Sequence, residues 1–148
     1  MPNLLIYSDG GSRGNPGPAG IGCVIKLKNE NSKLKVIEEI SEYIGTATNN
    51  QAEYRGVVAA LEFIKKNKSK LIDGEMTIEI FLDSQLIVEQ MNGKYKIRNE
   101  GLKPLYWHIR ELIMELGGRI VFKHITRDKN IEADKLVNIA IDKGAKSV

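Results

Sequence analysis

Four carboxylates that lie far apart in the sequence have the chemistry and the placement of a metal site. Asp9 and Asp83 each end a short apolar run that is typical of a strand, whereas Glu53 lies in the first turn of an expected helix and Asp134 inside a later one. Strand ends and helix starts meet at one rim of an α/β sheet. Four carboxylates at close range do not all stay ionised without a cation between them, and oxygen ligands suit Mg²⁺ or Mn²⁺. The sequence therefore predicts a divalent metal site.

The composition is that of a single globular domain covering residues 1–148. Hydrophobic residues make up 42% of the chain and charged residues 28%, which is enough for a real core. There is no run of about 18 apolar residues, so we expect no membrane span, and the first residues lack the pattern of a signal peptide. The one cysteine, Cys23, alternates with isoleucines and is interpreted as a small core residue rather than a reactive thiol. These features predict a cytoplasmic protein without an internal disulfide.

The charge distribution suits a polyanionic partner. The formal net charge is +3, and without the four proposed ligands the rest of the chain carries +7. A basic body around an acidic pocket attracts a polyanion toward bound metal. A lysine-rich solvated surface without a partner fits the composition equally well.

The apolar periodicity predicts the element order βββαβααβα. The first three strands should form an antiparallel meander, with the glycine-rich segment 10–20 as a turn-rich loop between the first two. The first and fourth strands must be parallel neighbours for Asp9 and Asp83 to meet, which a right-handed crossover through the first helix permits. The expected strands are 3–9, 21–27, 34–43, 75–82 and 119–125, and the expected helices are 48–68, 84–91, 102–116 and 130–143.

Five motifs, in matching order and spacing along essentially the whole chain, resemble type 1 ribonuclease H. The resemblance implies an α/β fold whose five-stranded mixed sheet has its first three strands as the meander and strands four and five parallel to strand one, flanked by helices. It also implies hydrolysis of the RNA strand of RNA–DNA hybrids. The motifs are Tyr7-Ser8-Asp9-Gly10-Gly11-Ser12, Gly14-Asn15-Pro16-Gly17-Pro18, Thr48-Asn49-Asn50-Gln51-Ala52-Glu53, Asp83-Ser84-Gln85 and Asn130-Ile131-Glu132-Ala133-Asp134.

The four acids match the family's metal ligands, and the chemistry of hydrolysis agrees with that match. Two ions about 3.5–4 Å apart activate water and stabilise the leaving oxygen in an in-line displacement, leaving 5′-phosphate and 3′-hydroxyl ends. No serine–histidine or cysteine–histidine pair suggests a covalent nucleophile. We therefore expect Asp9, Glu53, Asp83 and Asp134 to be catalytic and to hold two Mg²⁺ ions, or Mn²⁺, with the substrate.

Three amides lie beside the proposed ligands and match the family's contacts to the RNA strand. By resemblance, Asn15, Asn49 and Gln85 touch sugars or base edges near the scissile bond, where the 2′-hydroxyl distinguishes RNA from DNA. Amides both donate to and accept from such a hydroxyl. The alternatives are structural, because Asn49 is also expected to cap the first helix and Asn15 suits a turn before Pro16.

Other positions match contacts to the DNA strand. By resemblance, Thr48 and Asn99 hold a DNA phosphate, and Tyr95 lies where relatives place an aromatic along that strand. Thr48 and Asn99 also fit cap and loop roles, and Tyr95 equally fits a half-buried aromatic between helices. Trp107 and Phe122 occur in amphipathic patterns and are expected in the core.

The chain departs from many relatives at two places. Segment 92–101 stands where relatives carry a basic protrusion that grips the hybrid, and we expect no hybrid-binding domain before the first residue. Affinity should then rest on the metals and segment 94–98. The loop before the last helix lacks the family's histidine. His124 falls in a strand, where a structural role is favoured, and Arg127 is either a mobile charge near the leaving phosphate or a solvated loop cation.

Two alternatives to a ribonuclease H enzyme are a DNA-directed nuclease of the same superfold and a non-catalytic nucleic-acid-binding module. The first usually lacks the amides that read ribose, and the second is expected to lose acids that are all present here. We therefore expect an RNA–DNA hybrid as the substrate, no protein partner and a monomeric enzyme.

Overall fold

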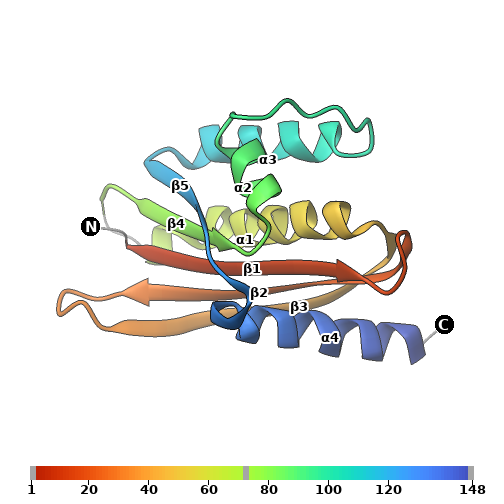
Figure 1. Ribbon diagram of the computed structural model, residues 1–148. Helices are drawn as coiled ribbons and strands as arrows, with labels where there is room; N and C mark the ends of the chain where they lie inside the picture. Colours follow the sequence, from red (N-terminus) through yellow and green to blue (C-terminus); the bar gives the residue numbers. More distant parts are fainter. Residues whose placement is uncertain (1–2, 72–73, 147–148) are drawn as a thin grey trace.

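The computed structural model describes residues 3–71 and 74–146, which form one five-stranded mixed sheet with helices on both faces (Figure 1). The strand order is β3-β2-β1-β4-β5, with β1 antiparallel to β2 and parallel to β4, and β5 parallel to β4, as predicted. The strands are β1 Leu4–Ser12, β2 Gly17–Lys28, β3 Leu34–Ala47, β4 Thr77–Leu82 and β5 Arg119–His124.

The helices cover the two faces unequally. One face is covered by α1, with α3 packed behind it, and the other by α4 over β1, β2 and β3 (Figure 1). The fold therefore gathers its largest core on the α1 side, where alternate residues of β1 and β4, such as Ile6 and Ile80, meet the stripe of Val57, Leu61 and Ile64. The helices are α1 Asn49–Leu71, α2 Gln85–Met91, α3 Lys103–Leu116 and α4 Ile131–Lys146, with a short 3-10 helix, η1, at Arg127–Lys129.

The predicted loop 10–20 is mostly strand. β1 continues to Ser12 and pairs with the start of β2, so a short turn remains between them. Gly14 takes a positive φ of 115° in that turn, whereas Gly10, and Gly22 just beyond the predicted loop, serve close packing. A Cβ on Gly10 would lie 2.3 Å from the backbone of Ala52 in α1, and one on Gly22 would lie 2.2 Å from the carbonyl oxygen of Ala133 in α4. Both helices therefore approach the strands that carry the site.

Several other boundaries and burial predictions differ in detail. β3 runs to Ala47 and α1 to Leu71, and α4 continues to Lys146, beyond the expected end at residue 143, while residues 147–148 lie outside the described part. Phe122 is buried as predicted, but Trp107 is 66% exposed. Ile109, Leu112 and Leu116 fill the inward stripe of α3, which leaves Trp107 on the outer face.

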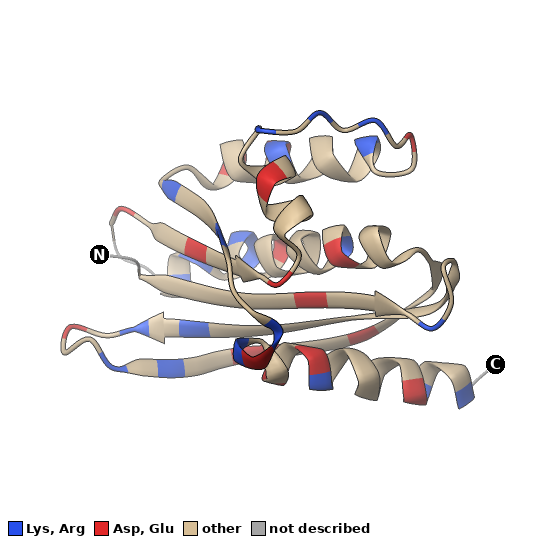
Figure 2. Cartoon of the chain, viewed as in Figure 1, with Lys and Arg blue, Asp and Glu red and all other residues tan. Residues whose placement is uncertain are grey.

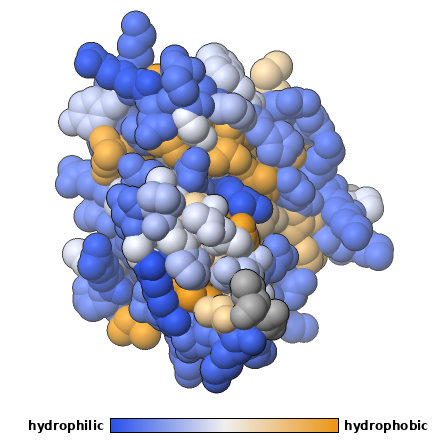
Figure 3. Space-filling view, turned by 90° about the vertical axis from the view of Figure 1, so that its right-hand side faces the viewer, coloured by the Kyte–Doolittle hydropathy of each residue, from blue (hydrophilic) through white to orange (hydrophobic). Residues whose placement is uncertain are grey.

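The surface is mainly hydrophilic. The face drawn in Figure 3 carries polar and charged side chains with smaller apolar patches between them. Across 3–71 and 74–146, no helix has the length and the apolar character that a bilayer crossing needs.

Candidate active site

Three of the four predicted ligands converge beside the carboxyl end of β4, where Asp83 follows the strand and Asp9 lies within the neighbouring β1, three residues before its end. Asp9, Glu53 and Asp83 each place a carboxylate oxygen within 4.8 Å of the other two. β1 and β4 run in parallel with Tyr7 opposite Phe81, so the acids that follow these residues reach the same rim. Because α1 begins at Asn49, Glu53 lies in its second turn rather than its first.

The environment opposes ionisation of Asp9 and Glu53. Burial, followed by the charge of Asp83, raises the pKa of Asp9 to about 8, although the Gly10 N–H donates to its Oδ1 at 2.9 Å. Burial and the charges of Asp9 and Asp83 likewise raise the pKa of Glu53 to about 8, against the opposing charge of Arg127. The Oε2 atom of Glu53 is enclosed without a hydrogen-bond partner. Buried oxygens with unmet charge and unmet acceptors fit a divalent cation.

Asp134 stands at the edge of this cluster. It is exposed in the first turn of α4, outside the group of three, yet its charge also contributes to the raised pKa of Asp9. Asn138, one turn later, donates through Nδ2 to the Asp134 carbonyl at 3.0 Å and to its Oδ2 at 3.5 Å. Asp134 is therefore close enough to act with Asp9 while remaining open to solvent.

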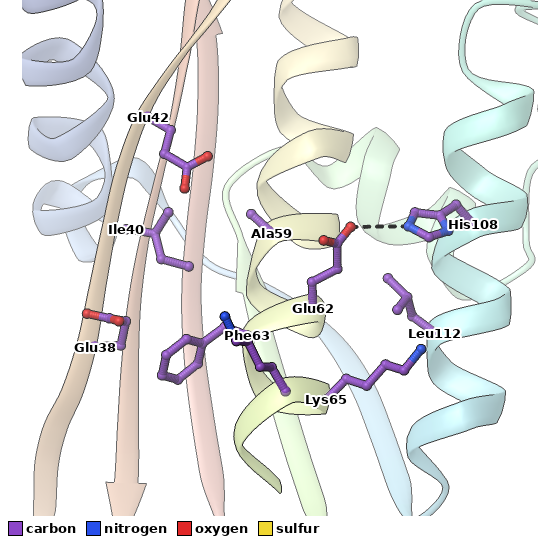
Figure 4. A pocket seen from close by; sticks show the side chains of 10 residues that line it. Glu38, Ile40, Glu42, Ala59, Glu62, Phe63, Lys65, His108 and Leu112 are labelled. Atoms are coloured by element: carbon purple, nitrogen blue, oxygen red, sulfur yellow. Dashed lines mark hydrogen bonds and ion pairs between the residues drawn. The ribbon is translucent and has the colours of Figure 1, made fainter.

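All four acids line one cleft of about 620 Å³. Its walls also carry Asn49, Arg13 and Arg127. A larger pocket of about 740 Å³ lies elsewhere, between β3, α1 and α3, where Glu62 points toward His108 with 3.2 Å between Oε1 and Nε2 (Figure 4). That pocket contains none of the predicted site residues, so the smaller, acidic cleft is the candidate active site.

The amides of Asn15 and Asn49 connect the β1–β2 hairpin to α1. Asn15 Oδ1 accepts from the Asn49 backbone N–H, and Asn49 Oδ1 accepts from the Ser12 N–H, both at 3.0 Å. Within 3–71 and 74–146, neither side-chain NH₂ group donates to a protein acceptor. The two amides therefore offer donors, rather than acceptors, to a ligand.

The helix cap belongs to Thr48 rather than to an asparagine. Thr48 Oγ1 accepts from the Gln51 N–H at 3.1 Å, and Gln51 Oε1 accepts from the Thr48 N–H at 2.9 Å. This is a reciprocal capping box, and it corrects the prediction that Asn49 caps the helix. The Thr48 hydroxyl hydrogen is left available to donate to a ligand.

The segment between α2 and α3 reaches the start of α1. A Cβ on Gly101 would lie 2.9 Å from Gln51 Nε2 and 3.1 Å from Asn99 Oδ1, so Asn99 is held near the cap that contains Thr48. Asn99 Oδ1 accepts from the Gly101 N–H at 2.7 Å. Tyr95 is 56% exposed, which excludes the half-buried alternative. Figure 2 shows cations along this segment.

The remaining predicted residues are Gln85, Arg127 and His124, and they differ in whether they line the cleft. Gln85 is exposed at the start of α2, where Ser84 Oγ accepts from the Ile87 N–H at 3.3 Å as the cap. Arg127 lines the cleft and acts on Glu53, whereas His124 is exposed at the end of β5 and is not a lining residue. Sequence reasoning assigned no role to the buried Asn130, because nothing in its spacing marks a contact to Asp83.

Comparison with known proteins places this site in a family. Residues 7–140 match the family model described as reverse transcriptase-like. A ribonuclease H of Ruthia magnifica subsp. Calyptogena magnifica is 35% identical over 97% of this chain and 98% of its own length. A bifunctional protein of Mycobacterium tuberculosis (strain ATCC 25618 / H37Rv) is 40% identical over 97% of this chain, and the chain spans 37% of that relative's length.

Solved structures agree with these relatives in fold and in extent. LC11-RNase H1, isolated from compost by a metagenomic approach, has a TM-score of 0.86 and 48% identity over 98% of this chain and 99% of its own. LC11-RNase H1 in complex with an RNA/DNA hybrid has a TM-score of 0.82 and 46% identity over 96% and 99%. With its five-stranded mixed sheet and its acidic cleft at the rim of β1 and β4, the chain belongs to the type 1 ribonuclease H family.

Proposed function

We propose that this chain is a single ribonuclease H domain that hydrolyses the RNA strand of RNA–DNA hybrids endonucleolytically. The observation that carries the proposal is the convergence of Asp9, Glu53 and Asp83 within 4.8 Å, next to amides whose donors face no protein acceptor. The ribonuclease H relatives, and the hybrid bound to LC11-RNase H1, support the same substrate.

The acids would hold two divalent cations, Mg²⁺ or Mn²⁺. Asp9, Glu53 and Asp83 form the enclosed part of the site, and Asp134 forms its solvent-facing side. Such ions, when bound, increase the acidity of water and stabilise an oxyanion leaving group. The protein contributes fixed carboxylates whose mutual repulsion the ions relieve. The products carry 5′-phosphate and 3′-hydroxyl ends.

The amides select ribose through their donors. Asn15 and Asn49 use their oxygens to join the hairpin to α1, so their NH₂ groups meet the substrate with a fixed direction. A 2′-oxygen accepts such a bond and a deoxyribose offers no acceptor at this position. Gln85, two residues from Asp83 and exposed, extends the same surface along the strand.

The DNA strand is held by the segment between α2 and α3. Exposed Tyr95 lies among Lys94, Lys96 and Arg98, and an aromatic among cations suits sugar stacking with phosphate contact. Thr48 and Asn99 take a DNA phosphate near the α1 cap. Arg127 places a positive charge beside Glu53 at the cleft wall, where it stabilises charge on the leaving phosphate.

Strand-labelled RNA–DNA, RNA–RNA and DNA–DNA duplexes of one sequence test this function. With Mg²⁺ or Mn²⁺, we expect internal cuts in the RNA of the hybrid and intact DNA in every duplex. The folded Asp83→Asn variant, at equal concentration, is the control for contaminating nuclease. Cutting of DNA–DNA duplexes would favour a DNA-directed nuclease, and hybrid binding without cleavage would favour a non-catalytic module.

A further inference from the structure

Asn130, at the residue before α4, joins the segments that carry three of the four acids. Its Nδ2 donates to the Ser8 carbonyl oxygen at 3.0 Å and to Asp83 Oδ2 at 3.1 Å. Its backbone oxygen accepts from the Asp134 N–H at 3.1 Å. Ser8 directly precedes Asp9 in β1, so one residue touches β1, the end of β4 and the first turn of α4.

The orientation of this amide is determined by its surroundings. Both neighbours of Nδ2, the Ser8 carbonyl and the Asp83 carboxylate, are acceptors, so a flipped amide would set oxygen against oxygen. Asn130 is 1% exposed, and its Oδ1 is enclosed without a hydrogen-bond partner among the described residues. Burying an acceptor without a partner is unfavourable. The enclosed Oδ1 therefore lowers the stability of the fold, whereas the Nδ2 group of the same side chain makes two hydrogen bonds.

We propose that Asn130 is a positioning residue that holds the Asp83 carboxylate in place for divalent cation binding. The proposal rests on the metal site of the proposed function. Once the acids are ionised, as binding of a cation requires, Asp9, Glu53 and Asp83 repel one another within 4.8 Å, and the bond to Oδ2 restrains Asp83 against that repulsion. The partners that orient metal ligands typically matter about 10- to 100-fold for affinity or activity.

The bond to Ser8 makes the restraint effective. Without it, the Asn130 side chain would follow Asp83 wherever repulsion moved the carboxylate. The Ser8 carbonyl belongs to β1, which pairs with both β2 and β4, so the amide transmits the rigidity of the sheet to Asp83. The backbone bond to Asp134 would persist in any substitution, which separates the side-chain role from the start of α4.

Magnesium binding without substrate tests the proposal. Isothermal titration calorimetry would compare wild type with Asn130→Ala and Asn130→Asp, and with Asn67→Ala as a matched control. Asn67 loses a comparable side-chain bond, from Nδ2 to the Phe63 carbonyl at 2.8 Å near the C-terminal end of α1. We expect about 10- to 100-fold weaker Mg²⁺ binding in both Asn130 variants and none of this loss in Asn67→Ala.

The aspartate variant isolates the donors as the cause. It keeps the volume of Asn130, but an ionised carboxylate donates to neither Ser8 nor Asp83. An added negative charge on its own would tighten Mg²⁺ binding, so weaker binding identifies the lost donors. In hybrid cleavage, kcat at low Mg²⁺ should fall and recover with added Mg²⁺, while KM for the hybrid stays near its wild-type value.

Three outcomes would overturn the proposal. One is a folded Asn130→Asp protein that binds Mg²⁺ as tightly as wild type or more tightly. Another is loss of the fold in both Asn130 variants by circular dichroism, because Asn130 would then be needed for the fold and not specifically for the site. The third is an equal loss of affinity in Asn67→Ala. Wild type that binds Mg²⁺ without cutting hybrids would refute the proposed function and leave this test valid.

Discussion

The acidic cleft and the segment between α2 and α3 differ in the sign of their charges and in how far those charges are exposed to water. In the cleft, burial and mutual repulsion raise the pKa values of Asp9 and Glu53 to about 8. On the segment, the side chains of Lys94, Lys96 and Arg98 are exposed to water. Lys94 has a carboxylate partner, Glu89 Oε2, at 3.4 Å from its Nζ. Charges in the cleft are therefore concentrated and weakly screened, whereas those on the segment are spread and screened by salt.

Because of this difference, we expect substitutions in the cleft and substitutions on the segment to change different kinetic parameters. A substitution in the cleft alters buried groups whose role water cannot take over, so it should lower kcat and weaken metal binding. A change on the segment removes one of several screened contacts, so it should act on KM and on its salt dependence. The segment is short, because α2 ends at Met91 and α3 starts at Lys103, and it carries no basic protrusion.

The largest expected effect is that of Asp83→Asn. The substitution removes an anionic ligand with nearly the same volume, so hybrid cleavage should fall by orders of magnitude while the fold stays intact. Steady-state cleavage with circular dichroism on the same sample measures both. Near-normal cleavage by the folded variant would show that Asp83 lies outside the catalytic site.

The second effect concerns the stability of the metal-free protein. The folded-state pKa values of Asp9 and Glu53 are about 8, above their ordinary values of 3.8 and 4.5. The protonated side chains of Asp9 and Glu53 therefore stabilise the folded state fully below about pH 4, and this contribution is lost as the pH rises to about 8. The slope should be about 1.4 kcal/mol per pH unit for each extra proton held in the folded state.

Urea unfolding in a chelating buffer between pH 4 and 9 measures this slope. Asp9→Asn should flatten it, and saturating Mg²⁺ at pH 8 should restore stability by mass action. A midpoint that rises across this range would contradict the raised pKa values.

The third effect is that of the amides on substrate choice. Asn15→Ala and Gln85→Ala should each reduce hybrid cleavage about tenfold, the worth of one neutral hydrogen bond, without changing Mg²⁺ binding. Duplexes with one to four ribonucleotides within DNA should need several consecutive riboses, because the amides span more than one nucleotide. Asn67→Ala again serves as the control. Efficient cutting beside a single ribose would show that these amides do not select the substrate.

The smallest effect is expected on the segment. Replacing Lys94, Lys96 and Arg98 together by alanine should leave kcat unchanged and raise KM. The slope of log affinity against log salt should become shallower by about 0.9 for each lost phosphate contact. Lys33→Ala with Lys35→Ala is the control, because Lys33 lies in the turn before β3 and Lys35 at the start of β3, both exposed. An unchanged slope in the triple variant would place the DNA contact elsewhere.

Local patterns predicted the elements and their order well. Alternation and helical periodicity report which face of an element is buried, so the element order, the parallel pairing of β1 with β4 and the shared rim of Asp9 and Asp83 followed from the sequence. The same reasoning failed where distant backbone decides. Gly10 was predicted to belong to a turn-rich loop but is a packing position, because α1, the helix that touches it, comes later in the chain.

The sequence by itself determined the fold class, because the order of the elements depends on residue type and periodicity, and it proposed the four acids and, by resemblance, the amides beside them. Only the tertiary structure decided how those groups are used. It placed the cap at Thr48, turned the oxygens of Asn15 and Asn49 inward and left Trp107 outside. It also brought Asn130 to Asp83, 47 residues away. Hydrogen-bond partners depend on which segments pack together, and no local pattern encodes that choice.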